Sequence, residues 1–281
     1  MKRFIVFSSM LVILAGAVFA NGEQEGGSGN LRLSMGGSTT MDPIMSSAIE
    51  VYRTEVDPAA ELSYDAPGST AGIQGTLNGI YDVGASSRAL FIREREQGLQ
   101  ATTIATDGLA VIVHETVPID DISIEDLAAV FVGEIRNWSE LGGPDQEIVV
   151  VNRDQASGTF GAFRELVLVR TYGDDARFIR QALVTESNGN MATMVTQTPY
   201  SIGYASLITL ERVEDQGGKA LSVNGVEDTK ETVLTGEYPI TRPLNVVTLG
   251  EPTGERKVIV DFLLSARGQE IVNEVGYLPL R

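Results

Sequence analysis

Cysteine is absent from this chain of 281 residues, and histidine occurs once, as His114. Without cysteine the protein can form no disulfide and offers no thiolate as a nucleophile or metal ligand. A single imidazole also excludes a zinc site made of several histidines, and the sequence predicts neither a metal nor any other cofactor. Basic residues are few, because 21 Lys and Arg stand against 38 Asp and Glu. Since nucleic acids are polyanions, this charge balance argues against a nucleic-acid partner.

Long apolar segments are also lacking, except near the N-terminus. There two basic residues precede an apolar run that ends at Phe19. Its roughly 16 residues fall short of the about 20 that span a bilayer, and small residues follow at the end of the run, as in secretory signal peptides. We therefore expect cleavage of residues 1–20 near Ala20 and a soluble, periplasmic or otherwise extracytoplasmic protein. Residues 21–30 (NGEQEGGSGN) are Gly-rich and polar, which predicts a flexible linker.

From residue 31 onward, short apolar runs alternate with helical patterns, which indicates an α/β fold. The Ser-Ile-Glu-Asp sequence at 123–126 predicts the start of a helix that Gly133 ends, and one last helix is predicted over 255–275. The predicted strands are 31–35, 61–64, 81–85, 109–114, 147–152, 201–205 and 244–249.

Three turns rich in Gly, Ser and Thr each follow a predicted strand and precede a helical pattern. They are GGSTTMDP at 36–43, PGSTAG at 67–72 and SGT at 157–159. At such a junction the first helical amides have no intrahelical partner, and the helix dipole places partial positive charge there. Small hydroxyl residues let an oxyanion approach and add donors of their own. Together the turns predict an anion site, although each alone is typical of ordinary helix capping.

Arg153 lies four residues before Ser157 of the third turn. From there its planar guanidinium could reach the same helix N-terminus and bind two oxygens of an anion. The alternative is a surface ion pair with Asp154 or a neighbouring carboxylate. The acidic composition does not exclude an anionic ligand, because salt screens distant charges beyond about 8 Å.

Further motifs extend the pattern over most of the chain. They are GSTTMDP at 37–43, GSTAG at 68–72, GASSR at 84–88, DGLAVIV at 107–113, GEIRNW at 133–138, NRDQASGTF at 152–160, NGN at 188–190 and PYSIGY at 199–204. In this order and at this spacing, the chain resembles the periplasmic phosphate-binding proteins of ABC transporters. The resemblance covers nearly all of residues 31–281.

This resemblance implies the type II fold of periplasmic binding proteins, in which a two-stranded hinge joins two α/β lobes and the ligand lies in the cleft. The first lobe would consist of residues 31–113 and 238–281, and the second of residues 114–237. The implied function is capture of inorganic phosphate and its delivery to the membrane permease of an ABC importer. We expect a monomer.

The resemblance also implies a set of phosphate ligands from both lobes, so phosphate should favour the closed form and drive hinge closure. The first lobe would contribute Thr39, the amide of Thr40, and Ser69. The second would contribute Arg153, Ser157, Gly158 and Thr159. Further candidates are Ser38, Thr70, Arg88, Asp107 and Asn190.

Ser87 departs from the family pattern. In well-known members an Asp at this position accepts the proton that phosphate retains near neutral pH, which excludes sulfate. A hydroxyl can also accept a hydrogen bond, but it does not repel an unprotonated oxyanion as a carboxylate does. Asp107 or Asp154 could supply the acceptor instead, so the selectivity of the predicted site for phosphate over sulfate stays open.

Three other functions are alternatives. A serine hydrolase would need a base within reach of Ser157, but no pattern links it to His114, and we expect no enzyme activity. Binding of another tetrahedral oxyanion (sulfate, arsenate or a phosphonate), or phosphate sensing without transport, is the second alternative. The aromatic residues Trp138, Tyr200 and Tyr204 could line a sugar or amino-acid site, but we favour core packing or a turn anchor for them, because the donors at Thr39, Ser69 and Thr159 suit a small anion.

Overall fold

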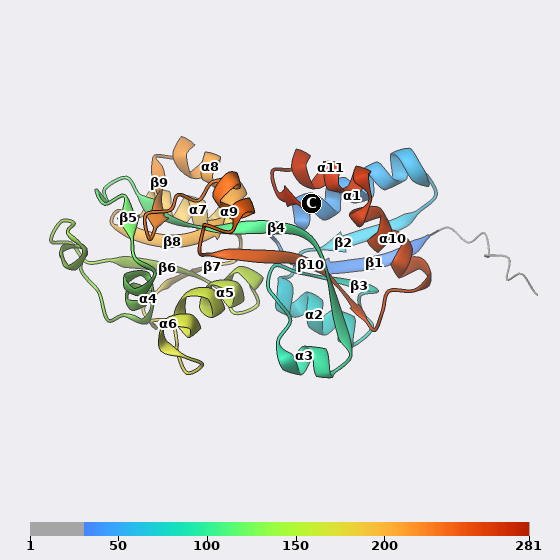
Figure 1. Cartoon of the computed structure of the whole chain (residues 1–281), viewed down its shortest axis with the longest axis horizontal. Helices are drawn as coiled ribbons and strands as arrows, with labels where there is room; N and C mark the ends of the chain where they lie inside the picture. Colours follow the sequence, from blue (N-terminus) through green and yellow to red (C-terminus); the bar gives the residue numbers. More distant parts are fainter. Residues whose placement is uncertain (1–30, 281) are drawn as a thin grey trace, which may run out of the picture.

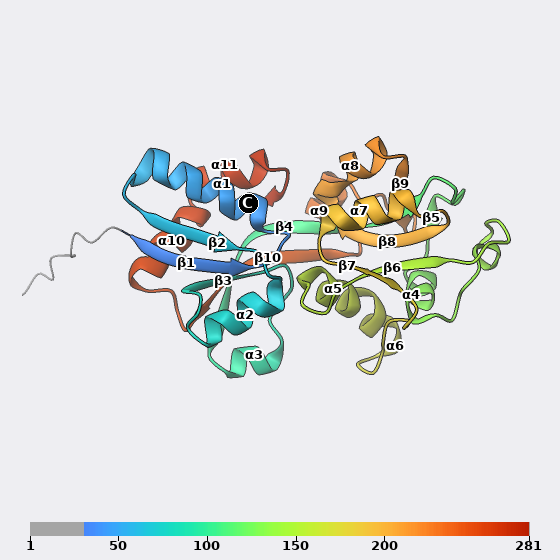
Figure 2. The same cartoon turned by 180° about the vertical axis from the view of Figure 1, so that it is seen from behind.

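Two α/β lobes, joined by two long strands, make up the molecule (Figure 1, Figure 2). The computed structural model describes residues 31–280, so the predicted signal peptide at 1–20 and the predicted linker at 21–30 lie outside the described residues. The predicted two-lobed α/β architecture is confirmed.

The first lobe is built on a sheet with the strand order β2, β1, β3, β10, β4. Strand β1 (Arg32–Gly37) is parallel to β2 (Glu61–Asp65) and β3 (Val83–Ser86), so the loops that follow these strands lie at one edge of the sheet. Helices α1 and α11 cover one face, and α2 and α3 cover the other (Figure 2). The helices are α1 (Asp42–Val51), α2 (Ser69–Leu77), α3 (Ile92–Glu96), α10 (Gly254–Leu264) and α11 (Ala266–Glu274), with a π-helical turn at Tyr52–Val56 and the short strand β11 (Leu278–Pro279).

The second lobe is built on β8 (Ser201–Ser206), β6 (Val149–Arg153) and β7 (Leu183–Thr185), in that order from the edge where β4 enters. Strand β6 is parallel to both neighbours. Strand β9 (Gly218–Val223) pairs antiparallel with β4 and parallel with β5 (Asp121–Ile122). The helices are α4 (Ile124–Val132), α5 (Gly158–Phe163), α6 (Arg170–Tyr172), α7 (Asn188–Gln197), α8 (Leu210–Asp215) and α9 (Lys230–Thr235), with further turns at Trp138–Leu141, Arg164–Val169 and Leu207–Thr209.

The connection between the lobes consists of β4 (Leu99–His114) and β10 (Thr241–Leu249), which pair antiparallel. Each lobe has its own hydrophobic core, and the cores divide along β4: Ile104 belongs to the first, whereas Leu109 belongs to the second. The second core includes Trp138 and Tyr204, both without exposed surface, so these aromatic side chains pack internally. The lobe boundaries at 113/114 and 237/238 stay a prediction.

The sequence prediction of one last helix over 255–275 is wrong, because the structure has two helices, α10 and α11. Ser265 separates them with an extended backbone (ψ 166°). Its Oγ accepts the amide hydrogen of Gly268 at 3.2 Å and donates to the carbonyl oxygen of Phe262 at 2.6 Å. One serine therefore ends the first helix and caps the second.

The carboxyl group of Asp228 lies near the second connection between the lobes and is buried with incomplete hydrogen bonding. It is 8% exposed, and its Oδ2 has no hydrogen-bond partner in the described part of the chain. Burial, with a smaller contribution from Glu214 and Glu227, raises the pKa of Asp228 to about 7. An unfolded Asp has a pKa of about 3.9. Between these values the folded protein binds more protons than the unfolded chain, so Asp228 makes stability fall as pH rises.

We therefore expect Asp228→Asn to raise the free energy of unfolding at pH 8 by roughly 1–4 kcal/mol, since each pKa unit corresponds to about 1.4 kcal/mol. The gain should be much smaller at pH 4. Urea unfolding followed by the fluorescence of Trp138, which is buried in the same lobe, measures both values. Asp175→Asn, at an exposed carboxylate of this lobe, is the control. An equal gain at both pH values would contradict the account.

Candidate functional site

The first predicted turn forms the loop between β1 and α1. Two tyrosine hydroxyls hold its backbone: Tyr64 donates to the carbonyl oxygen of Ser38 at 2.6 Å, and Tyr277 donates to that of Thr40 at 2.5 Å. The Ser38 hydroxyl accepts the amide hydrogen of Thr40 at 3.1 Å, so it serves the loop itself. This leaves the side chains of Thr39 and Thr40 to face the second lobe.

The second and third predicted turns meet across the gap between the lobes. Gly68 precedes α2 with φ 105°, a left-handed conformation that favours glycine. The amide of Thr70 donates to the carbonyl oxygen of Ala156 in the other lobe at 3.0 Å. Ser157 caps α5 and accepts the amide hydrogens of Thr159 and Phe160 at 3.1 and 3.3 Å. Its hydroxyl hydrogen stays available for donation.

Hydroxyl groups from all three turns lie close together. Thr40 Oγ1 is 3.3 Å from Thr159 Oγ1, which joins the two lobes. Ser69 Oγ is 3.4 Å from Ser87 Oγ. These two serines face Gly158 so closely that a Cβ at position 158 would lie 2.1 and 2.5 Å from the two hydroxyl oxygens. The structure thus brings five predicted ligands to one place.

Arg153 enters this cluster from the end of β6. It is 2% exposed, and Nη2 donates to the Glu186 carbonyl oxygen at 2.7 Å and to Thr39 Oγ1 at 3.4 Å, while Nη1 donates to Asn188 Oδ1 at 3.0 Å. Among the described residues the alternative ion pair with Asp154 is not formed; Oδ1 of that carboxylate accepts the amide hydrogen of Ala156. Burial lowers the pKa of Arg153 to about 10. The guanidinium therefore remains a cation at neutral pH.

A second buried arginine, Arg242, reaches the cluster from β10, and the sequence analysis did not identify it. Nη1 donates to Thr159 Oγ1 at 2.8 Å, and Nη2 reaches Thr40 Oγ1 at 3.4 Å. Asp107 Oδ2 accepts from Nε and Nη2 of Arg242 at 3.0 and 2.7 Å, and Oδ1 accepts from the Ser206 hydroxyl at 2.9 Å. Asp107, a predicted candidate, therefore holds Arg242. Burial raises the pKa of Asp107, and the charge of Arg242 opposes this effect.

Asn188 is a second site residue that sequence reasoning missed, because Asn190 of the same motif was named instead. Asn188 Nδ2 donates to Thr40 Oγ1 at 3.0 Å, and its Oδ1 accepts from Arg153. Asn190 is exposed, and its amide donates to Ser187 Oγ, which caps α7. The cap makes Asn188 the first residue of the helix and turns it toward the cluster.

Two further candidates lie at the edge of the cluster with other partners. Arg88 is 4% exposed and pairs with Glu94, because Nη1 and Nη2 donate to its two carboxylate oxygens at 2.9 and 2.8 Å. The guanidinium carbon also lies 4.0 Å from the centre of the Phe91 ring. Thr70 Oγ1 is 3.5 Å from the carbonyl oxygen of Gln155. Neither side chain contacts the clustered hydroxyls.

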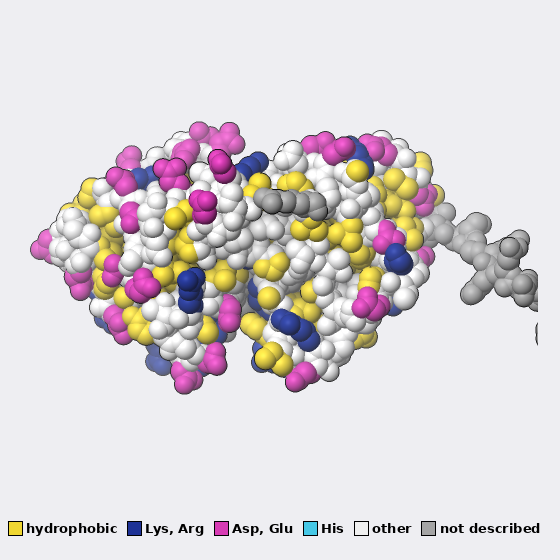
Figure 3. Space-filling model, in the orientation of Figure 1, with side chains coloured by type: hydrophobic (Ala, Val, Ile, Leu, Met, Phe, Trp, Pro, Cys, Tyr) yellow, Lys and Arg dark blue, Asp and Glu magenta, His cyan; other side chains and the backbone are white. Residues whose placement is uncertain are grey.

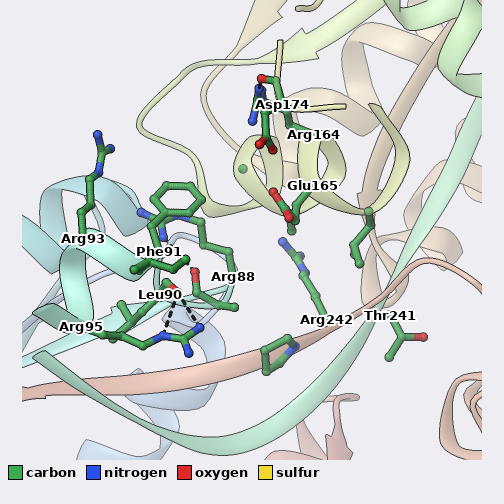
Figure 4. Close-up of a pocket in the computed structure, with 16 residues that line it drawn as sticks. Arg88, Leu90, Phe91, Arg93, Arg95, Arg164, Glu165, Asp174, Thr241 and Arg242 are labelled. Atoms are coloured by element: carbon green, nitrogen blue, oxygen red, sulfur yellow. Dashed lines mark hydrogen bonds between the residues drawn. The ribbon is translucent and has the colours of Figure 1, made fainter. Parts of the chain in front are cut away.

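A cavity of about 750 Å³ adjoins the cluster between the lobes. Figure 4 shows Arg88, Phe91 and Arg93 on one side and Glu165 and Asp174 on the other, with Arg242 rising between them. On the face shown in Figure 3, acidic side chains are scattered over both lobes, and both acidic and basic side chains lie beside the gap. Arginines outnumber acidic residues in the lining of the cavity, so positive charge is concentrated there.

The cluster has the chemistry of an anion site, because it combines hydroxyl donors with two buried guanidinium groups. His114 is not part of it: Nδ1 accepts the amide hydrogen of Thr116 at 3.1 Å, at the far end of β4. Within residues 31–280 no group of His, Asp and Glu is arranged to hold a metal ion. Over the same range, no helix is long and apolar enough to cross a membrane.

Comparison with known proteins gives consistent matches. Residues 22–267 match the model of the PBP superfamily domain. The chain is 37% identical over 252 residues to the phosphate-binding protein PstS of Borreliella burgdorferi, covering 89% of this chain and 90% of that protein. It is 34% identical over 267 residues to PstS of Bacillus subtilis, covering 93% and 84%. A Clostridium perfringens substrate-binding protein, solved with bound phosphate, is 33% identical with a TM-score of 0.80 over 89% of this chain and all of its own.

Proposed function

The chain belongs to the PstS family of phosphate-binding proteins within the PBP superfamily, and we propose that it binds inorganic phosphate between its lobes and delivers it to the permease of an ABC importer. One observation carries the proposal: hydroxyls of the first lobe meet groups of the second at a single buried place, where Thr39 contacts Arg153, Thr40 contacts Thr159, and Ser69 faces Gly158. The Clostridium perfringens relative, which contains phosphate, supports this choice of anion.

In the proposed site each lobe supplies part of the ligand set. The first lobe contributes Thr39, Thr40, Ser69 and Ser87, and the second contributes Arg153, Ser157, Gly158 and Thr159. Arg153 donates three of its five N–H groups to the carbonyl oxygens of Thr185 and Glu186 and to Asn188, which leaves two for an anion. Each charge-assisted hydrogen bond contributes about 1.5–3 kcal/mol. Hydroxyls complete the shell, because they can donate to an ionised oxygen and accept from a protonated one.

Phosphate bound in this way favours the closed arrangement of the lobes. Ligands from both sides are in place only when the lobes meet, so differential affinity for the closed form drives closure. Without an anion, the buried guanidiniums of Arg153 and Arg242 repel each other, which favours opening. The permease of the importer would then distinguish the loaded protein by its closed shape.

Calorimetric titration tests the proposal. The protein is unfolded, freed of carried-over anion and refolded, and phosphate is then added. We expect saturable binding at one site per chain. Absence of binding to correctly refolded protein would contradict the proposed function.

A broader specificity is the second candidate, and Ser87 favours it. Its side chain offers a hydroxyl where a carboxylate would repel a fully ionised anion. The hydrogen bonds of Asp107 to Arg242 and Ser206 argue against a role for Asp107 in place of that carboxylate. The same titration with sulfate and arsenate separates the candidates: comparable affinities for sulfate and phosphate indicate a general tetrahedral oxyanion site.

The proposed role is binding without catalysis, outside the cytoplasm, by a monomer. Ser157 is engaged in capping α5, and the only imidazole of the chain is bound to Thr116, so Ser157 is not paired with an imidazole base. Turnover of phosphate esters by the purified protein would argue against this role. The basic and apolar N-terminal sequence is the basis for proposing export.

A further inference from the structure

The strands that join the lobes supply a buried cation to the site. Arg242 of β10 lies directly opposite Asp107 of β4. Both side chains are 1% exposed, and the ion pair measures 2.7 Å. Because one carboxylate oxygen accepts from both Nε and Nη2, the plane of the guanidinium is fixed.

The remaining donors of Arg242 point toward predicted phosphate ligands of both lobes. Arginine has five N–H groups, of which Asp107 accepts two. Of the others, those on Nη1 donate to Thr159 Oγ1 at 2.8 Å and to the carbonyl oxygen of Ser87 at 3.3 Å, and Nη2 reaches Thr40 Oγ1 at 3.4 Å. Figure 4 shows the side chain rising from β10 into the space between the lobes. Arg242 therefore contacts the cluster from a hinge strand, whereas the predicted ligands come from the two lobes.

Arg242 also sets the charge of the cluster. Burial lowers the pKa of Arg153, Tyr204 and Asp154 oppose this effect, and the charge of Arg242 lowers the pKa to a smaller extent, so the two guanidiniums are electrostatically coupled. Within the described residues the salt bridges include the pair Arg242–Asp107 but none of Arg153. Two buried cations with one carboxylate leave a net positive charge that an anion can compensate.

We propose that Arg242 is a phosphate ligand supplied by the hinge and that Asp107 is the positioning residue that aims it. This inference rests on the proposed function. The bound anion is then held by the first lobe, by the second lobe and by the strands about which they turn. Hinge closure is then coupled to contact between Arg242 and the anion, because bending of β10 relative to the lobes moves Arg242 toward or away from the hydroxyls.

The test uses a double variant, Arg242→Gln with Asp107→Asn. Removing both charges together avoids leaving a buried carboxylate unpaired, which by itself destabilises proteins strongly. In calorimetric titration we expect the phosphate affinity to fall between about 10-fold and 150-fold, the loss of one charge-assisted hydrogen bond. Arg242→Lys, which keeps the charge but not the fork, should lie between this variant and the wild type.

The control is Arg267→Gln with Glu55→Gln, which likewise neutralises both members of an ion pair, here between α11 and the π-helical turn at Tyr52–Val56. Its phosphate affinity should equal that of the wild type. Melting of the phosphate-free proteins is measured in parallel. Wild-type affinity in the Arg242/Asp107 variant, even with a lower melting temperature, would overturn the inference and leave Arg242 a structural role. Absence of binding by the wild-type protein would instead overturn the proposed function, and the inference with it.

Discussion

Replacing Arg153 with alanine should lower the phosphate affinity by about 100-fold or more. The guanidinium can direct two charge-assisted hydrogen bonds at the anion, each worth about 1.5–3 kcal/mol, and a factor of ten in affinity corresponds to about 1.4 kcal/mol. In the structure this side chain is buried and already reaches Thr39 across the cleft. Calorimetric titration of phosphate-free protein measures the loss.

Arg164→Ala is the control for this variant. Arg164 belongs to the same lobe and also donates to backbone carbonyl oxygens, those of Asp174 and Ala176, but it contacts no hydroxyl of the cluster. Removal of either arginine therefore leaves backbone acceptors without their partners, while only Arg153 faces the proposed ligand. Equal losses of affinity in the two variants would assign Arg153 to structural support alone.

Gly158→Val should prevent the lobes from closing on phosphate. A Cβ at this position would lie 2.1 Å from Ser69 Oγ and 2.5 Å from Ser87 Oγ, and both serines are buried in the opposite lobe. The branched side chain would hold the lobes apart, so the ligands of one lobe would no longer reach an anion bound to the other. Loss of several hydrogen bonds predicts a fall in affinity of about 100-fold or more by calorimetry.

The stability of the separate cores should change little in Gly158→Val, because the collision lies between the lobes. Gly189→Ala is the control: its Cβ would lie 3.1 Å from the terminal Nη1 of Arg212, and its next neighbours, Arg212 Cζ and Ser187 Oγ at 3.8 and 3.9 Å, are in ordinary contact inside the second lobe. We expect that variant to bind phosphate as the wild type does. Normal affinity in Gly158→Val would show that close contact between α5 and the serines is not needed for binding.

The junction turns could be predicted because the forces that shape them are local. Ser157 caps the helix that follows it, and Gly68 adopts the left-handed conformation that glycine permits. The same reasoning identified Ser123, whose hydroxyl accepts the amide hydrogen of Asp126 at the start of α4, with Gly133 ending that helix. A strand, a turn and a helix in sequence are enough to place such residues at one edge of a sheet.

Arg242 could not be predicted in this way, because all of its partners are distant in sequence. Asp107 is 135 residues away, Thr159 is 83 and Thr40 is 202. The local signal is the single charged residue in the strand at 241–249 (TRPLNVVTL), which indicates a buried partner without identifying it. Only the antiparallel register of the hinge strands decides that this partner is Asp107.

Two other differences between the sequence predictions and the structure also have physical causes. Strand β4 begins at Leu99, not at 109 as predicted, because its polar first half is stabilised by pairing with β10 and shows little apolar periodicity. In the NGN motif at 188–190, the cap formed by Ser187 decides which asparagine faces the site. A sequence motif locates such a loop but does not orient its side chains.

The central claim is that phosphate closes the two lobes, and a distance between them tests it most directly. The chain has no cysteine, so Glu96→Cys and Arg170→Cys, at exposed positions of the first and second lobes, would carry the only two spin labels. Pulsed dipolar spectroscopy then measures the distance between the labels with and without phosphate. We predict a longer, broader distribution in the phosphate-free protein and a shorter, narrower one at saturating phosphate. An identical distribution in both states would contradict the account.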